Sequence, residues 1–177
     1  MSDNEIYDKV YSEVSETLGD SPSMGFSVWR GMLVDLQAVM ETVIPYDIRY
    51  GGLPSFYEAG VKSGEEFGKW VIKQFNLEEK SIKERTRYVD ALLDQLNIGK
   101  PEYVGTNEEG NVLRFDGGTM FAKEYKKVGR NVCYHGAGFT AGSTSVIAGG
   151  RKFKVRETSC VAAGDPYCEF VISPEKK

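Results

Sequence analysis

Three cysteines and one glutamate in the last third of the chain are the residues best suited to metal chemistry. Cys133 precedes a segment rich in small residues, and Glu157, Cys160 and Cys168 follow within a short stretch. Two strands joined by a seven-residue connection would bring Cys160 close to Cys168. Three thiolates and one carboxylate suit a tetrahedral zinc ion, and a closed set of four protein ligands is usually structural. We therefore interpret Cys133, Glu157, Cys160 and Cys168 as a zinc-binding set.

The spacing of these residues leaves other interpretations open. The sequence has no Cys-x-x-Cys pair, and small buried thiols are common in intracellular protein cores. Regular strand alternation would place Glu157 and Cys160 on opposite faces, so a shared site requires a bulge or bend near the strand end. If one cysteine is not a ligand, His135 is the natural substitute, although a lone histidine beside a packed helix is more often structural.

The same residues carry a resemblance to a known family. Its C-terminal signature is a Glu, two residues, a Cys, a small-residue run with Gly-Asp-Pro, and then Cys-x-Phe, which here extends from Glu157 to Phe170. Two weaker motifs are a glycine-containing helix that begins near Cys133 and an upstream Tyr57-Glu58-Ala59-Gly60 followed by Gly64. On these motifs, residues 28–173 resemble the 4-vinyl reductase domain family.

The resemblance implies an α+β ligand-binding fold, related to trafficking-complex subunits and to haem-nitric-oxide-associated domains. Family members serve as sensor domains of phenol- and hydrocarbon-responsive regulators or as accessory proteins of bacteriochlorophyll synthesis. In the aromatic-sensing regulators this motif holds a structural zinc, which the resemblance carries onto Cys133, Glu157, Cys160 and Cys168. The phenol sensors hold the ligand's hydroxyl with a His and a Trp that precede the first cysteine, whereas the one histidine here, His135, follows it.

Helices are predicted in the first part of the chain and strands mainly in the second. Apolar residues recur at helical spacing over residues 1–19, 28–44, 55–75 and 81–96. The later predicted elements are a β-hairpin over 102–106 and 111–115, an apolar stretch over 119–125, a buried helix over 132–147, and strands over 152–160 and 167–172. This order predicts an α+β fold in which N-terminal helices pack on a mostly antiparallel sheet.

A break after the first helix suggests a division of the chain. Residues 19–23 read Gly-Asp-Ser-Pro-Ser, a composition typical of a linker. We therefore expect an N-terminal helix and linker over residues 1–22 and a ligand-binding domain over residues 23–177. The isolated amphipathic helix is too short to be stable alone and should pack on another surface. We expect a homodimer in which residues 1–18 contribute to the interface or cover the partner's pocket.

A stripe of glycines in the helix predicted over 55–75 has two interpretations. Gly60, Gly64 and Gly68 are four residues apart and therefore lie on one helix face. They either seat a neighbouring helix, which is the more common role, or leave space for a ligand. Aromatic residues near this stripe and near the metal helix complete a predicted ligand pocket, formed by Gly64, Phe67, Trp70, Tyr134 and Phe139. A pocket of this kind favours flat apolar ligands.

Composition narrows the range of functions. The chain has 177 residues, which fits one domain, and a net charge of −4. This charge balance argues against a broad nucleic-acid-binding surface. No window approaches 18 consecutive apolar residues, and the acidic N-terminus lacks the apolar core of a secretory signal. We therefore expect a cytoplasmic protein with neither nucleic-acid nor membrane partners.

These observations favour a cytoplasmic domain that binds an apolar, aromatic or hydrocarbon-like small molecule and holds a structural zinc. Two alternatives stay open: an accessory protein or reductase acting on a vinyl-bearing tetrapyrrole, as the family name suggests, and a dimeric interaction scaffold. An enzyme is less favoured, because a closed zinc set leaves no catalytic metal position and the sequence carries no nucleotide-binding motif.

Overall fold

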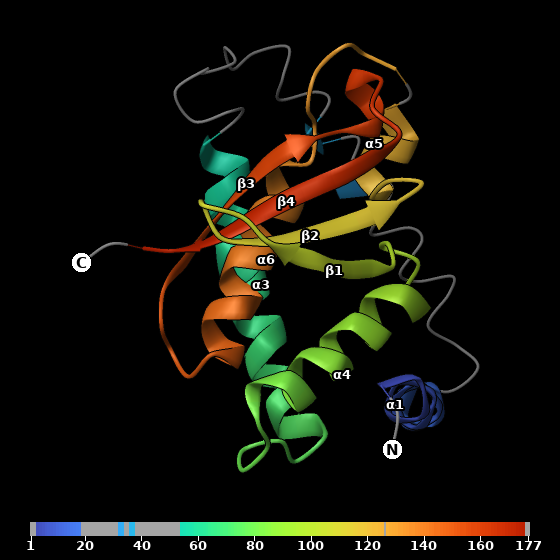
Figure 1. Cartoon of the computed structure of the whole chain (residues 1–177), viewed down its shortest axis with the longest axis vertical. Coiled ribbons are helices and arrows are strands. Elements are labelled where there is room, and N and C mark those ends of the chain that lie inside the picture. The colour runs from blue at the N-terminus through green and yellow to red at the C-terminus, as the bar shows by residue number, and fades with distance from the viewer. Residues whose placement is uncertain (1–2, 19–31, 34–35, 38–53, 126, 176–177) are drawn as a thin grey trace.

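A four-stranded antiparallel sheet lies on one side of a group of helices in the computed structural model (Figure 1). The structure describes residues 3–18, 32–33, 36–37, 54–125 and 127–175. The strands, in the spatial order β1-β2-β4-β3, are β1 (Pro101–Thr106), β2 (Asn111–Asp116), β3 (Phe153–Ser159) and β4 (Tyr167–Pro174). The helices are α1 (Asp3–Leu18), α3 (Pro54–Gln74), α4 (Ile82–Gln95), α5 (Met120–Tyr125), α6 (Tyr134–Ile147) and the short 3-10 helix η2 (Val161–Ala163).

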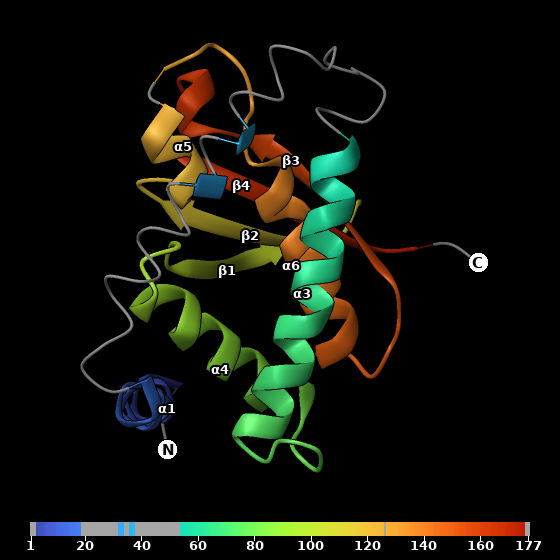
Figure 2. The ribbon, with the colours of Figure 1, turned by 180° about the vertical axis from the view of Figure 1, so that it is seen from behind.

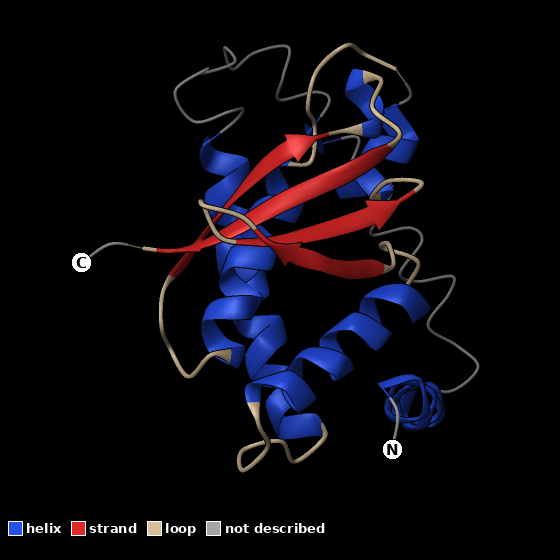
Figure 3. Ribbon diagram, in the orientation of Figure 1, coloured by secondary structure: helices blue, strands red, loops and turns tan. Residues whose placement is uncertain are grey.

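This arrangement confirms the predicted α+β fold (Figure 3). The predicted hairpin forms β1 and β2, and the predicted small-residue helix forms α6. The apolar stretch over 119–125, to which the sequence assigned no element type, is the short helix α5. The helix predicted over 28–44 and the linker over 19–23 lie mostly or wholly outside the described residues. Within the described ranges, no helix combines the length and apolar character that crossing a bilayer requires.

Helix α6 occupies the centre of the molecule, between the sheet and α3 (Figure 2). Most of its side chains are buried, as expected of a helix that lacks a polar face. Glycines on both helices let the two backbones touch. A Cβ atom added at Gly64 would lie 2.1 Å from the carbonyl oxygen of Phe139, and one at Gly138 would lie 2.0 Å from that of Tyr57. The space against Gly64 is thus filled by α6, which favours the helix-packing interpretation of the stripe.

Helix α1 packs on α4 of the same chain. The Tyr7 hydroxyl donates a hydrogen bond to Asp94 at 3.0 Å, and Val10 and Val14 are buried in a core shared with α3 and α4. The apolar stripe of α1 therefore has its packing partner within the chain. The homodimer that we predicted from this helix loses the reason given for it.

The two faces of the sheet differ in character because neighbouring residues alternate between them. On the face toward α6, Phe115 of β2 pairs with Cys168 of β4, and both are buried. On the opposite face, Arg114 pairs with Glu169 in a 3.1 Å salt bridge and lies 3.9 Å from the ring of Tyr167. The covered face therefore positions the candidate functional residues, and the other presents charged side chains.

We predict that Gly64→Ala destabilises the fold, although alanine is the better helix former. The added Cβ would collide with the backbone of Phe139, which cannot rotate away. Overpacking of this kind costs about 1–3 kcal/mol, whereas helix propensity alone would stabilise the variant by about 1 kcal/mol. Denaturant unfolding followed by circular dichroism measures the sign.

Gly136→Ala in α6 is the matched control for this experiment. A Cβ at Gly136 would lie 3.8 Å from Cζ of Phe170, which is ordinary van der Waals contact. This variant should unfold at the same or a higher denaturant concentration than the parent protein. If Gly64→Ala were as stable as Gly136→Ala, the close contact between α3 and α6 would be contradicted.

Candidate metal centre and adjacent cavity

The four residues predicted to bind metal come together where α6 meets the β3–β4 pair. Their ligand atoms lie within 4.8 Å of one another. Cys133 immediately precedes α6, Glu157 lies in β3, Cys160 lies between β3 and η2, and Cys168 lies in β4. All three cysteines are buried and free of disulfides. The structure therefore brings the whole predicted ligand set to one place.

An irregularity in β3 brings Glu157 and Cys160 to the same site. The pairing of β3 with β4 is regular as far as Glu157 and then shifts register before Ser159. This shift is the bend that the sequence required. Beyond it, the backbone N–H of Cys160 donates a hydrogen bond to the side chain of Asp165 at 2.8 Å, and Gly164 adopts a positive φ of 113°. This turn directs the chain back into β4 and toward Cys168.

The spacing of the three sulfur atoms matches a shared tetrahedral ion. The Sγ atom of Cys133 lies 3.9 Å from that of Cys160 and 3.8 Å from that of Cys168, and the last two are 4.0 Å apart. A disulfide would require about 2.05 Å. A tetrahedron with zinc–sulfur bonds of about 2.3 Å has an edge of about 3.8 Å. The sulfur positions therefore fit zinc without rearrangement.

Glu157 offers one oxygen atom that lacks a partner. Its Oε2 accepts a hydrogen bond from the backbone N–H of Cys133 at 3.1 Å, whereas Oε1 is buried with no hydrogen-bond partner among the described residues. Burial raises the pKa of the Glu157 carboxyl and of the Cys133 thiol. An unpartnered buried oxygen is costly, and a divalent cation would stabilise the ionised carboxylate and thiolates. The donor set therefore fits a metal ion.

Neighbouring groups also orient the sulfur atoms. Oγ1 of Thr119 lies 3.0 Å from Sγ of Cys133. Hydrogen bonds from the thiols of Cys133 and Cys160, and then from the backbone N–H groups of Val161 and Thr119, lower the pKa of the Cys168 thiol. Such outer hydrogen bonds commonly fix the orientation of metal ligands.

His135 lies outside the ligand cluster. Its Nε2 atom is 3.3 Å from Oγ of Ser63 on α3, and its ring centre is 5.7 Å from that of Phe121. Burial lowers the pKa of the imidazole. Of the two residues that the sequence left open as the remaining ligand, the described cluster contains Cys133 and not His135.

Three of the residues predicted to line an aromatic pocket form a cluster on α3 and α6. The ring centre of Phe67 lies 5.0 Å from that of Phe139 and 6.1 Å from that of Trp70. Tyr134 is buried at the start of α6, with its hydroxyl hydrogen-bonded to the preceding loop. Gly64 contacts the backbone of α6. None of these five residues lines the cavity described next.

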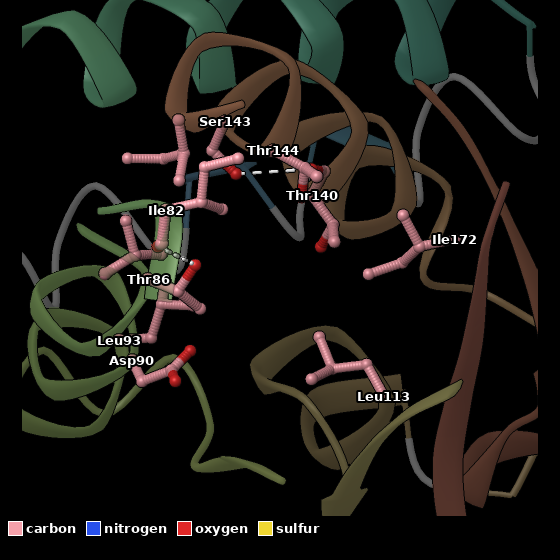
Figure 4. A pocket seen from close by; sticks show the side chains of 11 residues that line it. Ile82, Thr86, Asp90, Leu93, Leu113, Thr140, Ser143, Thr144 and Ile172 are labelled. Carbon is pink, nitrogen blue, oxygen red and sulfur yellow. Dashed lines mark hydrogen bonds between the residues drawn. The ribbon is translucent and has the colours of Figure 1, made fainter. Parts of the chain in front are cut away.

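A cavity of about 100 Å³ lies between α4, α6 and the covered face of the sheet (Figure 4). It combines aliphatic side chains with a few polar groups, a lining typical of small-molecule sites. The aliphatic members are Ile82, Val89, Leu93, Leu113, Ile147 and Ile172, and the polar members are Thr86, Asp90, Thr140, Ser143 and Thr144. Its size suits a molecule of only a few heavy atoms.

The sequence analysis missed this cavity, although α4 contains a signal for it. Thr86, Asp90 and Leu93 are spaced by four and three residues, so they share a helix face next to the buried Val89. A carboxylate on the apolar face of a helix is unusual. Hydroxyl residues at Thr140, Ser143 and Thr144 form a matching stripe on α6.

The Asp90 carboxylate points into the cavity (Figure 4). No described residue donates a hydrogen bond to it. Burial raises the pKa of Asp90 to about 7, and the charge of Arg87 on the same helix acts in the opposite direction. The negative charge of Asp90 also contributes to the raised pKa of Tyr7 on α1. Asp90 is thus an acid whose ionised form lacks a close partner within the described chain.

We predict that Asp90→Asn removes part of the pH dependence of stability. The folded-state pKa lies above the ordinary value of 3.8, so the contribution of Asp90 is complete below about pH 4 and is lost as pH rises through about 7. The variant should therefore gain roughly 1–3 kcal/mol relative to the parent protein between pH 4 and pH 8. Thermal melts over this range measure the difference.

Asp116→Asn is the control, because Asp116 is an exposed carboxylate at the end of β2. Its stability difference from the parent protein should change little with pH. A difference between Asp90→Asn and the parent protein that stays constant over the range would show that Asp90 has an ordinary pKa.

Comparison with known proteins supports both the motif and the fold. Residues 118–174 match the family model of the vinyl-4-reductase domain, which confirms the resemblance for the segment that carries the metal ligands. A solved structure described as the phenol-responsive sensory domain of the transcription activator PoxR with phenol has 15% identity and a TM-score of 0.65, covering 82% of this chain and 74% of that chain.

Two further solved structures are similar. A trafficking protein particle complex subunit 3 from Naegleria fowleri, covalently bound to palmitic acid, has 10% identity and a TM-score of 0.67, and the match covers 86% of this chain and 96% of that one. A vinyl-4-reductase family protein from Methanocaldococcus jannaschii has 18% identity and a TM-score of 0.47, with 84% and 96% covered. No curated protein matches the sequence.

Proposed function

We propose that this chain is a cytoplasmic domain that binds a small apolar molecule in the cavity between α4, α6 and the sheet. The observation that carries the proposal is the cavity itself, whose lining is mainly aliphatic with few polar groups. Two proteins with similar folds hold small molecules, phenol in one and covalently bound palmitic acid in the other. This likeness supports ligand binding and does not identify the ligand of this chain.

The proposal includes one structural zinc ion held by Cys133, Glu157, Cys160 and Cys168. The sulfur spacing, the buried unpartnered oxygen of Glu157 and the convergence of four donors support it. A bound zinc would supply folding free energy, because the unfolded chain does not hold these ligands together. With four protein ligands, the site favours a structural role over a catalytic one.

The metal centre and the cavity share two structural elements. Cys133 precedes α6, and Thr140 of the same helix lines the cavity. Cys168 and Ile172 share the covered face of β4, since residues an even number of positions apart in a strand point to the same side. A zinc ion that fixes α6 against β4 would therefore also fix two walls of the cavity.

The size of the cavity argues against the tetrapyrrole alternative at this position. Sites for drug-sized ligands enclose about 300–1,000 Å³, whereas this cavity encloses about 100 Å³. A tetrapyrrole is larger than most drugs, so it would need a different site or a large rearrangement. The described cavity therefore favours a small ligand.

We predict about one zinc per chain after purification without chelator, as measured by elemental analysis. Cys160→Ser should lower both the zinc content and the melting temperature, because it removes one ligand and part of the metal-linked folding free energy. Glu169→Gln is the control, since Glu169 lies in β4 but bonds Arg114 on the other sheet face. It should leave the zinc content unchanged. Metal-free protein with three titratable thiols would contradict the zinc site.

We predict that small apolar probes such as toluene, phenol and cyclopentane bind at this cavity. Their binding should shift the amide NMR signals of α4, α6 and β4. Thr144→Leu adds apolar volume to the wall and should weaken binding, because filled space excludes the probe. Thr17→Leu, at an exposed site on α1, should not. Absence of saturable shifts for every probe, or equal binding by both variants, would contradict a ligand site here.

A further inference from the structure

The hydroxyl groups of the cavity have their hydrogen atoms already engaged. Oγ1 of Thr86 donates to the carbonyl of Ile82 at 2.9 Å, and Oγ1 of Thr140 donates to that of Gly136 at 2.9 Å. Oγ of Ser143 donates to the carbonyl of Thr140 at 3.3 Å. A hydroxyl that donates its one hydrogen retains only lone pairs for other partners. These three side chains can therefore only accept further hydrogen bonds.

Asp90 adds a carboxylate to this set of acceptors. Its side chain points from α4 toward the space bordered by Leu113, Ile172 and Thr140 (Figure 4). The described residues that line the cavity include no Lys, Arg or His. An anionic ligand would thus meet a carboxylate and several oxygen lone pairs with no compensating cation, which is unfavourable at short range. The polar part of a suitable ligand must be a hydrogen-bond donor.

We propose that the cavity binds a small aliphatic amine whose ammonium group pairs with the Asp90 carboxylate. This inference rests on the proposed function, because it names the ligand class of the same cavity. An ammonium group carries three donors and no acceptor, so it complements a site that offers only acceptors. The aliphatic lining suits the hydrocarbon part of the same molecule. A fatty acid, which ends in a carboxylate, would lack a partner here.

The electrostatics of Asp90 agree with this assignment. Burial raises its pKa to about 7, which shows that the ionised form lacks compensation in the ligand-free chain. A bound cation within hydrogen-bond distance would supply that compensation. The groups that interact with the carboxylate are Arg87 on α4, whose charge only partly offsets burial, and Tyr7 on α1.

The test uses three probes with the same ring and different polar groups: cyclopentylamine, cyclopentanol and cyclopentanecarboxylate. Calorimetry on the full chain at pH 8 measures their affinities. We expect the amine to bind about tenfold or more tightly than the alcohol, as a charge-assisted hydrogen bond allows, and the carboxylate to bind least. Asp90→Asn should abolish the advantage of the amine while leaving the alcohol unchanged.

Asp116→Asn, a carboxylate-to-amide change at an exposed position, should leave all three affinities unchanged. Equal affinities of amine and alcohol, or an amine advantage that survives in Asp90→Asn, would overturn the amine assignment. If neutral apolar probes bind at the cavity and no amine does, the assignment fails and the proposed function stands. If no probe of any kind binds there, both fail.

Discussion

The contact between the backbones of α3 and α6 is the constraint on which the rest of the structure depends. α6 can lie between the sheet and α3 only because glycines at the crossing remove the side chains that would hold the helices apart. Interiors pack densely, so a single added methyl group at this crossing has no space to occupy. From this central position α6 delivers Cys133 to the metal cluster and Thr140 to the cavity. Both candidate sites therefore depend on one helix–helix contact.

The metal centre was predictable from the sequence because residue type restricts it strongly. Three of its four ligands lie within a short stretch, Glu157 to Cys168, and the turn at Gly164 and Asp165 returns the chain to the same place. Thiolates and a carboxylate in one buried cluster have few other roles. The bend between Glu157 and Ser159 was also implied, since a regular strand would separate two of the ligands.

The cavity could not be predicted in the same way, because its walls come from segments far apart in the sequence. Leu113, Thr140 and Ile172 are ordinary core residues when each is viewed alone, and only the tertiary packing brings them together. The aromatic residues suggested a pocket elsewhere, yet Phe67 and Phe139 pack on each other where α3 and α6 meet. Asp90 was the one local signal, a charged residue on a helix face that is otherwise apolar. The fold itself followed from the periodicity of α3, α4 and the β1–β2 hairpin, which are long enough to identify their type.

The contact of α1 with α4 has a consequence for how the molecule would accommodate a larger guest. α6 is fixed on one side by backbone contact with α3 and on the other by the sheet, so it has no direction in which to yield. α4 packs mainly on α1, and the hydrogen bond between Tyr7 and Asp94 joins the two. The two helices therefore form a hinged flap over an otherwise rigid floor. Expansion of the interior would displace this pair as one body, and its outward movement would report occupancy at the surface of the protein.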